Sequence, residues 1–257
     1  MTGPEPQPPE TDRDAVEVVI AHQERASLRV GSGFVKVDPD LAGAEREVAA
    51  MTSAPVPTPE ILWHRPPVLA LAEVRGTPIA RLGRPSTSSA AAWTAAGAVV
   101  RRLHDAPLPG WPGRGVAEKT SNLDTECTWL VAHDVLPQDL VTRNREIAEA
   151  ALRPAAPVFM HGDLHVAHLF VEGDEVTGVL DWSEAGQGDA MFDLASLTLG
   201  HRDRLDDVLT GYGEGADREV IRGWWSLRCL VAVRWLVDHG FDPFAPGAEV
   251  DVLRSQV

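Results

Sequence analysis

Short apolar runs separated by turn residues fill the first third of the chain. Four of these runs predict β-strands at residues 15–21, 26–30, 33–37 and 68–74. The Gly31-Ser32 pair between the second and third runs predicts a hairpin turn. Good helix formers over residues 41–51 predict a helix, and the proline-rich residues 55–63 end it and lead toward a further strand. We therefore expect a small antiparallel sheet with one helix packed on it.

Longer patterns with helical spacing follow Pro85. They predict helices at residues 86–105, 122–133, 138–152, 192–200, 203–213 and 220–240. Residues 158–182 interrupt this series with apolar strands on either side of a polar turn. The periodicity of the last helix favours a core position for Trp224, Trp225 and Trp235 over a role in lining a ligand site.

These patterns predict an α+β fold of two lobes. Residues 15–80 form a sheet-rich N-terminal lobe, and residues 81–257 form a larger helical C-terminal lobe. The first residues, 1–14, are rich in proline and acidic residues, and they predict a disordered tail.

The bulk composition excludes several classes of protein. The 257 residues carry a net charge of −15, from 38 acidic and 23 basic residues, which repels nucleic acids and anionic membranes and attracts cationic ligands. No apolar run is long enough to span a bilayer, and the first residues do not resemble a secretory signal, so we expect a cytoplasmic protein. The two cysteines, Cys127 and Cys229, are too few for a disulfide framework or a Cys-rich metal site. The sequence makes no prediction of the oligomeric state.

Two carboxylates on neighbouring polar turns indicate the chemistry. Asp163 lies in the segment HGDLHVAH (residues 161–168), and Asp181 ends the apolar strand VTGVL. A carboxylate at the end of a buried strand is costly unless it has a partner or a metal. Phosphoryl transfer needs such a pair: one carboxylate orients the acceptor hydroxyl, and the other holds Mg²⁺ against a nucleoside triphosphate.

The same segments resemble motifs of the aminoglycoside phosphotransferase family, relatives of the protein kinases. HGDLHVAH is similar to the family's H-G-D-x-x-x-x-N loop, VLDW to its I-D-[WFY] loop, and GQGDAMFDLA (residues 186–195) to its G-D-P-x-x-D-L-A stretch. The resemblance implies a protein-kinase-like fold, with Asp163 as the catalytic carboxylate and Asp181 as the principal Mg²⁺ ligand. It also implies that Asp193 anchors the loop, and Asp189 is expected to cap the following helix.

The N-terminal lobe supplies candidates for nucleotide binding. Lys36 interrupts the apolar strand GFVKV, where a lysine is unexpected unless its ammonium reaches a site or lies on an exposed edge. The resemblance implies that it contacts the α- and β-phosphates of ATP or GTP. Its expected partner is Glu47 on the helix, with Glu45 as the competing choice on another face. By the same resemblance, the segment from Ala72 to Val74 connects the lobes and binds the base. His104, near the end of its helix, is expected to be a packed or capping residue.

Two positions depart from the family pattern. The loop expected to cover the phosphates, residues 21–27, contains no glycine. His168 stands where the family usually has Asn, and imidazole suits Mg²⁺ less well than an amide oxygen does. His168 therefore marks a degenerate enzyme, or merely hydrogen-bonds Asp163, or joins Asp163 and Asp181 in catalysis and metal binding. The macrolide phosphotransferase branch carries H-G-D-L-x-x-x-H with histidine at this place, and the local run resembles it.

These observations predict an O-phosphotransferase that acts on a hydroxyl of a small, cationic molecule. An antibiotic is the expected acceptor, with a macrolide ahead of an aminoglycoside because of His168. Glu184, Asp124 and Glu126 are candidates to bind an acceptor amine. A nucleotide-binding pseudokinase with a regulatory role is the alternative. A metal-dependent hydrolase using His161, Asp163, His165, His168 and Asp181 is a third hypothesis, although that spacing matches no zinc signature.

Overall fold

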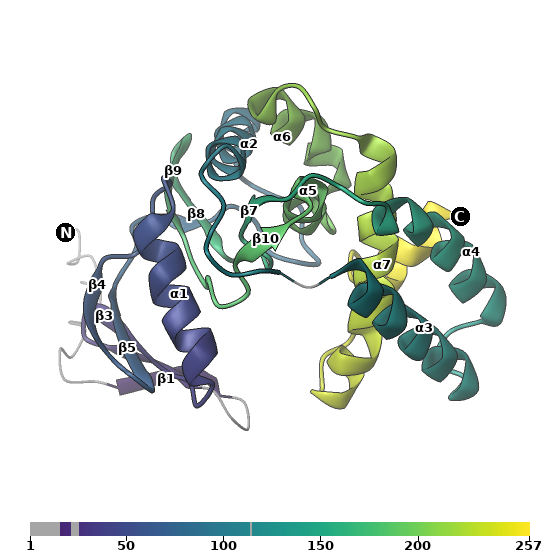
Figure 1. Cartoon of the computed structure of the whole chain (residues 1–257), viewed down its shortest axis with the longest axis horizontal. Coiled ribbons are helices and arrows are strands. Elements are labelled where there is room, and N and C mark those ends of the chain that lie inside the picture. Colours follow the sequence, from purple (N-terminus) through teal and green to yellow (C-terminus); the bar gives the residue numbers. More distant parts are fainter. Residues whose placement is uncertain (1–15, 22–25, 114) are drawn as a thin grey trace, which may run out of the picture.

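A sheet-rich lobe and a mainly helical lobe make up the molecule, as the short apolar runs and the helical patterns of the sequence predict (Figure 1). The computed structural model describes residues 16–21, 26–113 and 115–257. The predicted tail, residues 1–14, lies outside the described residues, as do residues 22–25 of the loop expected to cover the phosphates.

Five antiparallel strands form the sheet of the N-terminal lobe. They are β1 (Val16–Ala21), β2 (Ala26–Val30), β3 (Gly33–Val37), β4 (Ile61–Arg65) and β5 (Val68–Ala72), in the spatial order β1-β2-β3-β5-β4. Alternate residues of β5, Leu69 and Leu71, are buried, which is the period of two expected for a half-buried strand. Helix α1 (Leu41–Ser53) packs on this sheet through a buried stripe that includes Ala44, Glu47 and Ala50 (Figure 1). All the predicted strands and this helix are confirmed.

Short strands at the junction of the lobes support the two polar loops. One small sheet has the order β6-β8-β9 and consists of β6 (Thr77–Pro78), β8 (Leu169–Glu172) and β9 (Glu175–Val179). The other pairs β7 (Val158–Met160) with β10 (Gly186–Gly188). The loop with Asp163 follows β7, and Asp181 follows β9, so the two sheets bring the ends of β7 and β9 to one place.

The C-terminal lobe is mainly helical. Its helices are α2 (Ala90–His104), α3 (Val116–Ala132), α4 (Gln138–Ala148), α5 (Ala190–Thr198), α6 (Leu205–Tyr212), α7 (Arg218–Asp238) and α8 (Glu249–Gln256), with 3₁₀ turns at Glu149–Leu152 and Arg202–Arg204. Helix α3 begins six residues before the predicted start, directly after Gly115, because the glycine- and proline-rich stretch ends there. Helix α8 was not predicted; it is short, and only Val250, Val252 and Leu253 are buried. Across the described residues, no helix is both long and apolar enough to cross a bilayer.

Helix α7 runs through the core of the C-terminal lobe, but its tryptophans differ in environment. Trp224 and Trp225 are buried, as predicted, and so are Cys127 and Cys229. Trp235 is 48% exposed, so the prediction of a core position for it is wrong. It lies in the last turns of the helix, beyond the buried residue Val233, where the lobe no longer covers the helix.

Helices α2 and α6 approach so closely that glycine is required on both. A Cβ added to Gly211 would lie 1.7 Å from the Thr94 carbonyl oxygen, and one added to Gly97 would lie 1.9 Å from the Val208 carbonyl oxygen. Both obstacles are backbone atoms, which cannot move aside as a flexible side chain can. The helices are therefore packed at a distance that only glycine permits.

We expect Gly211→Ala to lower the free energy of unfolding by about 1–3 kcal/mol, the usual cost of overpacking. Alanine is otherwise the better helix former by about 1 kcal/mol, so helix propensity alone predicts the opposite sign. Urea unfolding followed by circular dichroism measures the change. Gly110→Ala is the control, because a Cβ there meets no atom within 4 Å. Equal stability of the two variants would show that α2 and α6 can separate at little cost.

Candidate active site

The loop after β7 holds Asp163 and is fixed through its backbone. Gly162 has φ = 84°, and a Cβ there would lie 2.2 Å from the Glu184 carbonyl oxygen. The amides of His161 and Gly162 donate to the Asp193 carboxylate over 2.7 and 2.9 Å. Glycine is therefore needed both for the left-handed backbone and for the close approach of the loop that carries Glu184.

Asp193 is the buried anchor of this loop. Its carboxylate is fully buried and also receives His104 Nε2 at 3.1 Å, while His104 Nδ1 lies 3.0 Å from the Tyr212 hydroxyl. Burial alone would raise the pKa of Asp193, but the hydrogen bond and charge of His104 lower it below its ordinary value. The structure thus confirms the anchoring role predicted for Asp193 and the packed role predicted for His104. Asp189 accepts from the Met191 amide and caps α5, as predicted.

Asp181 follows β9 with its backbone in the left-handed region, at φ = 61°. Such backbone conformations are uncommon for residues other than glycine and are concentrated at functional sites. Its Oδ1 accepts from Lys36 Nζ at 2.9 Å, and the same ammonium lies 2.6 Å from Glu47 Oε1. Glu47 is buried, whereas Glu45 is exposed. The predicted pairing of Lys36 with Glu47 is therefore present, and it extends to Asp181.

The three charges of this cluster fix one another's protonation states. Burial acts to lower the pKa of Lys36, but Asp181 and Glu47 together raise it above its usual value. Burial raises the pKa of Glu47, and the Lys36 ammonium offsets this only in part. Burial also acts to raise the pKa of Asp181, but Lys36 and His168 hold it well below its usual range. At neutral pH, Lys36 is thus a cation and Asp181 an anion.

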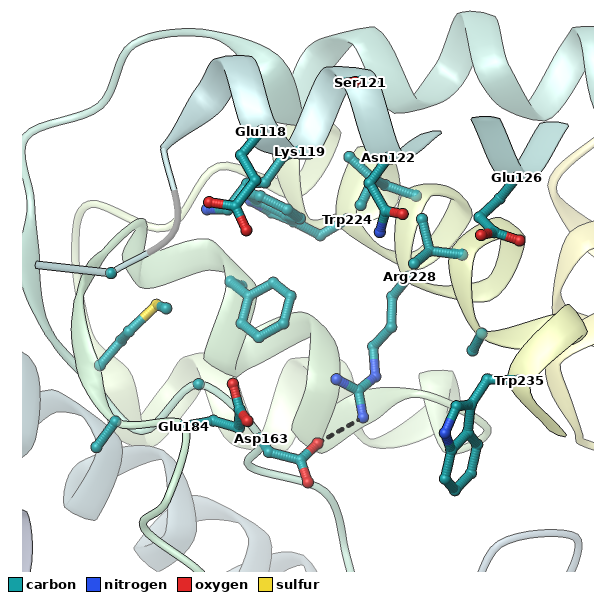
Figure 2. A pocket seen from close by; sticks show the side chains of 18 of the residues that line it. Glu118, Lys119, Ser121, Asn122, Glu126, Asp163, Glu184, Trp224, Arg228 and Trp235 are labelled. Atoms are coloured by element: carbon teal, nitrogen blue, oxygen red, sulfur yellow. Dashed lines mark hydrogen bonds and ion pairs between the residues drawn. The ribbon is translucent and has the colours of Figure 1, made fainter. Parts of the chain in front are cut away.

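Asp163 has a cationic partner that the motifs did not reveal. Arg228, on α7, donates from Nη2 to Asp163 Oδ1 over 2.8 Å, as Figure 2 shows. Burial acts to raise the pKa of Asp163, but the Arg228 guanidinium lowers it below its usual value. A sequence signal did exist: Arg228 interrupts the apolar run of α7, as Lys36 interrupts the apolar run of β3.

His168 lies between the carboxylates of Asp163 and Asp181. Its Nδ1 lies 2.8 Å from the Asp163 carbonyl oxygen, so Nδ1 carries the proton and donates it. The other nitrogen, Nε2, lies 3.6 Å from Asp181 Oδ2. Nε2 of His168 and Oδ2 of Asp181 are thus two potential ligand atoms close to each other, which is an arrangement that a cation between them would stabilise.

The donor set at Asp181 fits a divalent cation. Its carboxylate supplies the hard oxygen that Mg²⁺ prefers, and His168 Nε2 adds one nitrogen beside it. Within the described residues, Asp163, His165 and His168 also bring ligand atoms within 4.8 Å of one another. Burial lowers the pKa of His165 to about 3, so its ring is neutral. The hydrolase hypothesis is not supported, because His161 uses one nitrogen on the Leu180 carbonyl oxygen and the other on the Asp163 amide.

A cavity of about 1150 Å³ opens beside Asp163, between α3, α7 and the loops after β7 and β9 (Figure 2). Its charged lining consists of five carboxylates and three cations: Asp40, Glu118, Glu126, Asp163, Glu184, Arg46, Lys119 and Arg228. Leu227, Phe192, Trp224 and Trp235 give it apolar surface, so Trp224 and Trp235 line the cavity although their periodicity favoured core positions over that role. The candidate acceptor site is therefore wide, partly aromatic and net acidic.

The two acidic residues of α3 that the sequence predicted as acceptor-binding candidates differ in their position relative to the cavity. Asp124 is absent from the lining and receives Arg145 Nη2 at 2.8 Å on the exposed side of the helix, so its prediction as an acceptor-binding residue does not agree with the structure. Glu126 does line the cavity, with its side chain 15% exposed. Arg234 comes no closer than 3.7 Å, and Glu126 Oε2 has no hydrogen-bond partner among the described residues. Glu184 lines the cavity, as its prediction requires.

One backbone amide of the segment expected to bind the nucleotide base is already used in a hydrogen bond within the protein. The Ala72 amide donates to the Glu60 carbonyl oxygen over 2.9 Å, so it is used within the sheet and is not free for a base. Val74 lies just beyond the end of β5, and no backbone hydrogen bond involves it in the described part of the chain. Of the two predicted residues, Val74 is therefore the better placed.

Comparison with known proteins gives consistent matches. The sequence model of the phosphotransferase enzyme family matches residues 7–228. The streptomycin 3''-kinase of Streptomyces griseus is 28% identical over 204 residues, which cover 70% of this chain and 74% of that protein.

Solved structures agree with these matches. Aminoglycoside phosphotransferase APH(3'')-Id from Streptomyces rimosus, also solved with ADP and streptomycin, has a TM-score of 0.60 and 27% identity over 86% of this chain and 94% of its own. Macrolide 2'-phosphotransferase MphH from Brachybacterium faecium has a TM-score of 0.62 and 19% identity, covering 94% of this chain and 91% of its own. These likenesses confirm the fold that the motifs predicted.

We expect Asp193→Asn to destabilise the protein by about 1–3 kcal/mol, because an amide cannot accept from both loop amides and leaves a buried donor unpaired. The folded-state pKa of Asp193 is depressed, so its contribution is present above the ordinary carboxyl pKa of about 3.9 and is lost as the pH falls through the folded-state value. The difference between wild type and variant should therefore shrink below about pH 4. Urea unfolding at several pH values measures it, with the exposed Asp203→Asn as control. A difference that does not change with pH would contradict the assigned ionisation.

Proposed function

Because this chain belongs to the phosphotransferase enzyme family, we propose that it transfers the γ-phosphoryl group of a nucleoside triphosphate to a hydroxyl of a cationic antibiotic. The observation that carries this proposal is the joining of the Asp163 and Asp181 loops beside the acidic cavity, with Lys36 bound to both Asp181 and Glu47. Each part that phosphoryl transfer needs has a counterpart there: a carboxylate for the acceptor, a cation for the phosphates and a ligand for a metal.

In the proposed reaction, the acceptor hydroxyl lies against the free oxygen of Asp163 and loses its proton to that carboxylate. The acceptor oxygen forms a bond to the γ-phosphorus, and the bond between that phosphorus and the oxygen bridging to the β-phosphate breaks. The products are a phosphate ester, a nucleoside diphosphate and one proton. Because the transition state is loose, Asp163 contributes mainly by orienting the hydroxyl and not as a strong base. This role is compatible with the lowered pKa of Asp163.

Asp181 and His168 are the proposed holders of Mg²⁺. When bound, the metal neutralises charge on the β- and γ-phosphates. Lys36 is the proposed contact to the α- and β-phosphates, and Glu47 keeps its ammonium in position and charged. Val74 is the proposed contact to the base. The likeness to a structure solved with ADP supports a nucleotide co-substrate, and assays with both ATP and GTP decide between the two.

The proposed acceptor is an aminoglycoside of the streptomycin type. The relatives at 28% and 27% identity are a streptomycin 3''-kinase and an aminoglycoside phosphotransferase, whereas the macrolide phosphotransferase, at 19%, supports the fold alone. The charge of the cavity agrees with this preference. Its lining has three glutamates, Glu118, Glu126 and Glu184, but only two cations besides the Arg228 that pairs with Asp163. The local resemblance of His168 to the macrolide branch is therefore outweighed.

The pseudokinase alternative depended on His168 and on the glycine-free loop. The geometry favours an enzyme, because His168 is directed at Asp181 and because Lys36, Glu47, Asp163 and Asp181 are all in place. Nucleotide binding without phosphoryl transfer to any streptomycin-type, other aminoglycoside or macrolide acceptor would support the pseudokinase instead.

We expect Asp163→Asn to reduce kcat by about 10²–10⁴-fold, the usual contribution of a positioned proton acceptor. Nucleotide affinity should change little, because Asp163 lies on the acceptor side. Asp181→Asn should also abolish turnover, but it should weaken nucleotide binding in the presence of Mg²⁺. Coupled release of nucleoside diphosphate and calorimetric nucleotide titration measure the two effects. The exposed Glu172→Gln serves as control, and near-normal turnover of Asp163→Asn would contradict the assigned role.

Two neighbouring carboxylates of α3 provide a matched test of acceptor binding. We expect Glu126→Gln to raise the KM for a cationic acceptor by about 10-fold, the loss of one charge-assisted hydrogen bond in a partly buried site. Asp124→Asn should leave KM unchanged, because Asp124 pairs with Arg145 outside the cavity. Steady-state kinetics with streptomycin and saturating nucleotide measure both. Equal KM values for the two variants would remove Glu126 from the acceptor site.

A further inference from the structure

We infer that Arg228 is a positioning residue: it holds the Asp163 carboxylate so that one oxygen is directed at the acceptor hydroxyl. The inference rests on the proposed function, since it concerns the orientation of the group that accepts the hydroxyl proton. It assigns a role in turnover to a side chain of α7 that lies 65 residues away from Asp163 in the sequence.

The Asp163 side chain depends on Arg228 for its orientation. Within the described residues, the Arg228 guanidinium supplies the one hydrogen bond that the Asp163 carboxylate accepts, 2.8 Å to Oδ1. The other oxygen, Oδ2, lies 3.8 Å from His168 Nδ1 and 3.9 Å from His165 Nε2, distances too long for hydrogen bonds. Oδ1 is therefore committed to Arg228, and Oδ2 is left to accept from the acceptor.

Arg228 is itself held on a rigid support. It belongs to the long helix α7, and its neighbours Leu227 and Cys229 are buried. Its guanidinium carbon lies 5.8 Å from the centre of the Phe192 ring, which in turn meets the Trp224 ring edge to face at 5.0 Å. The cation is thus fixed by aromatic packing as well as by its ion pair, and its side chain is only 23% exposed.

The rest of the loop does not perform this task. Asp193 fixes the backbone of His161 and Gly162, but that leaves the Asp163 side chain free to rotate about its own bonds. Because a misplacement of about 1 Å can cost about 10²-fold in rate, a fixed cation at Oδ1 has a direct effect on turnover.

The test compares kinetics of Arg228→Ala, Arg228→Lys and wild type, with streptomycin as acceptor and ATP or GTP. We expect Arg228→Ala to lower kcat by about 10–100-fold while acceptor and nucleotide KM change little. Arg228→Lys should recover part of this loss, because lysine retains the charge without the planar fork of donors. Millimolar guanidinium should raise kcat of Arg228→Ala, and the same concentration of urea should not. Arg222→Ala, an exposed position on the same helix, is the control.

Each other outcome overturns the inference in a recognisable way. A kcat of Arg228→Ala equal to that of wild type removes the role while the proposed function stands. The contact is merely structural if the loss of kcat follows the unfolded fraction in thermal melts. In that case guanidinium does not reverse the loss, and Arg228→Lys does not reduce it. A loss confined to acceptor KM makes Arg228 a binding residue instead. If the wild-type enzyme phosphorylates none of the acceptors with either nucleotide, the proposed function fails, and the inference fails with it.

Discussion

One ammonium group connects the two lobes at the centre of the site. Lys36 comes from a strand of the N-terminal sheet, and it contacts Glu47 of α1 and Asp181 of the loop after β9, 145 residues further along the chain. Three charges in a partly buried place would be unfavourable singly, but each lowers the cost of the others. This contact therefore ties the N-terminal sheet to the loop that carries Asp181, and under the proposed function it helps to set the phosphates relative to the acceptor.

The same principle of pairing a carboxylate with a distant cation or donor recurs around the site. Asp193 receives two loop amides and His104, and Asp163 receives Arg228. Each pair joins segments that are far apart in sequence, so the catalytic loop is assembled from α2, α5 and α7 as much as from its own residues. The Phe192 ring packs against Trp224 and lies beside the Arg228 guanidinium.

The sequence was sufficient where chemistry is encoded locally. Asp163, Asp181 and Asp193 stand in motifs whose spacing is fixed by single loops, so their placement, and the two-lobed fold, could be predicted. The contact of Arg228 with Asp163 could not be predicted, because it depends on how α7 is rotated in the folded lobe. Glu126 was a candidate, but the sequence could not separate it from Asp124. Asp124 and Glu126 differ by two positions, about 200° around a helix, and only the packing decides which faces the cavity. Trp235 has a core-like sequence context, but the lobe ends before it.

Helix α7 has a consequence for how this enzyme could evolve. Its 21 residues, about 32 Å of helix, bear Arg228 against Asp163 and Trp235 in the lining of the cavity. Under the proposed roles, a substitution that shifts or tilts this helix to admit a new drug would also disturb the orientation of Asp163. Helix α3 carries Glu118 and Glu126, and within the described part of the chain the side-chain partners of Asp163 and Asp181 come from other elements. Under the proposed function, activity toward altered antibiotics should therefore arise first through changes on α3, where substrate range can change without loss of turnover.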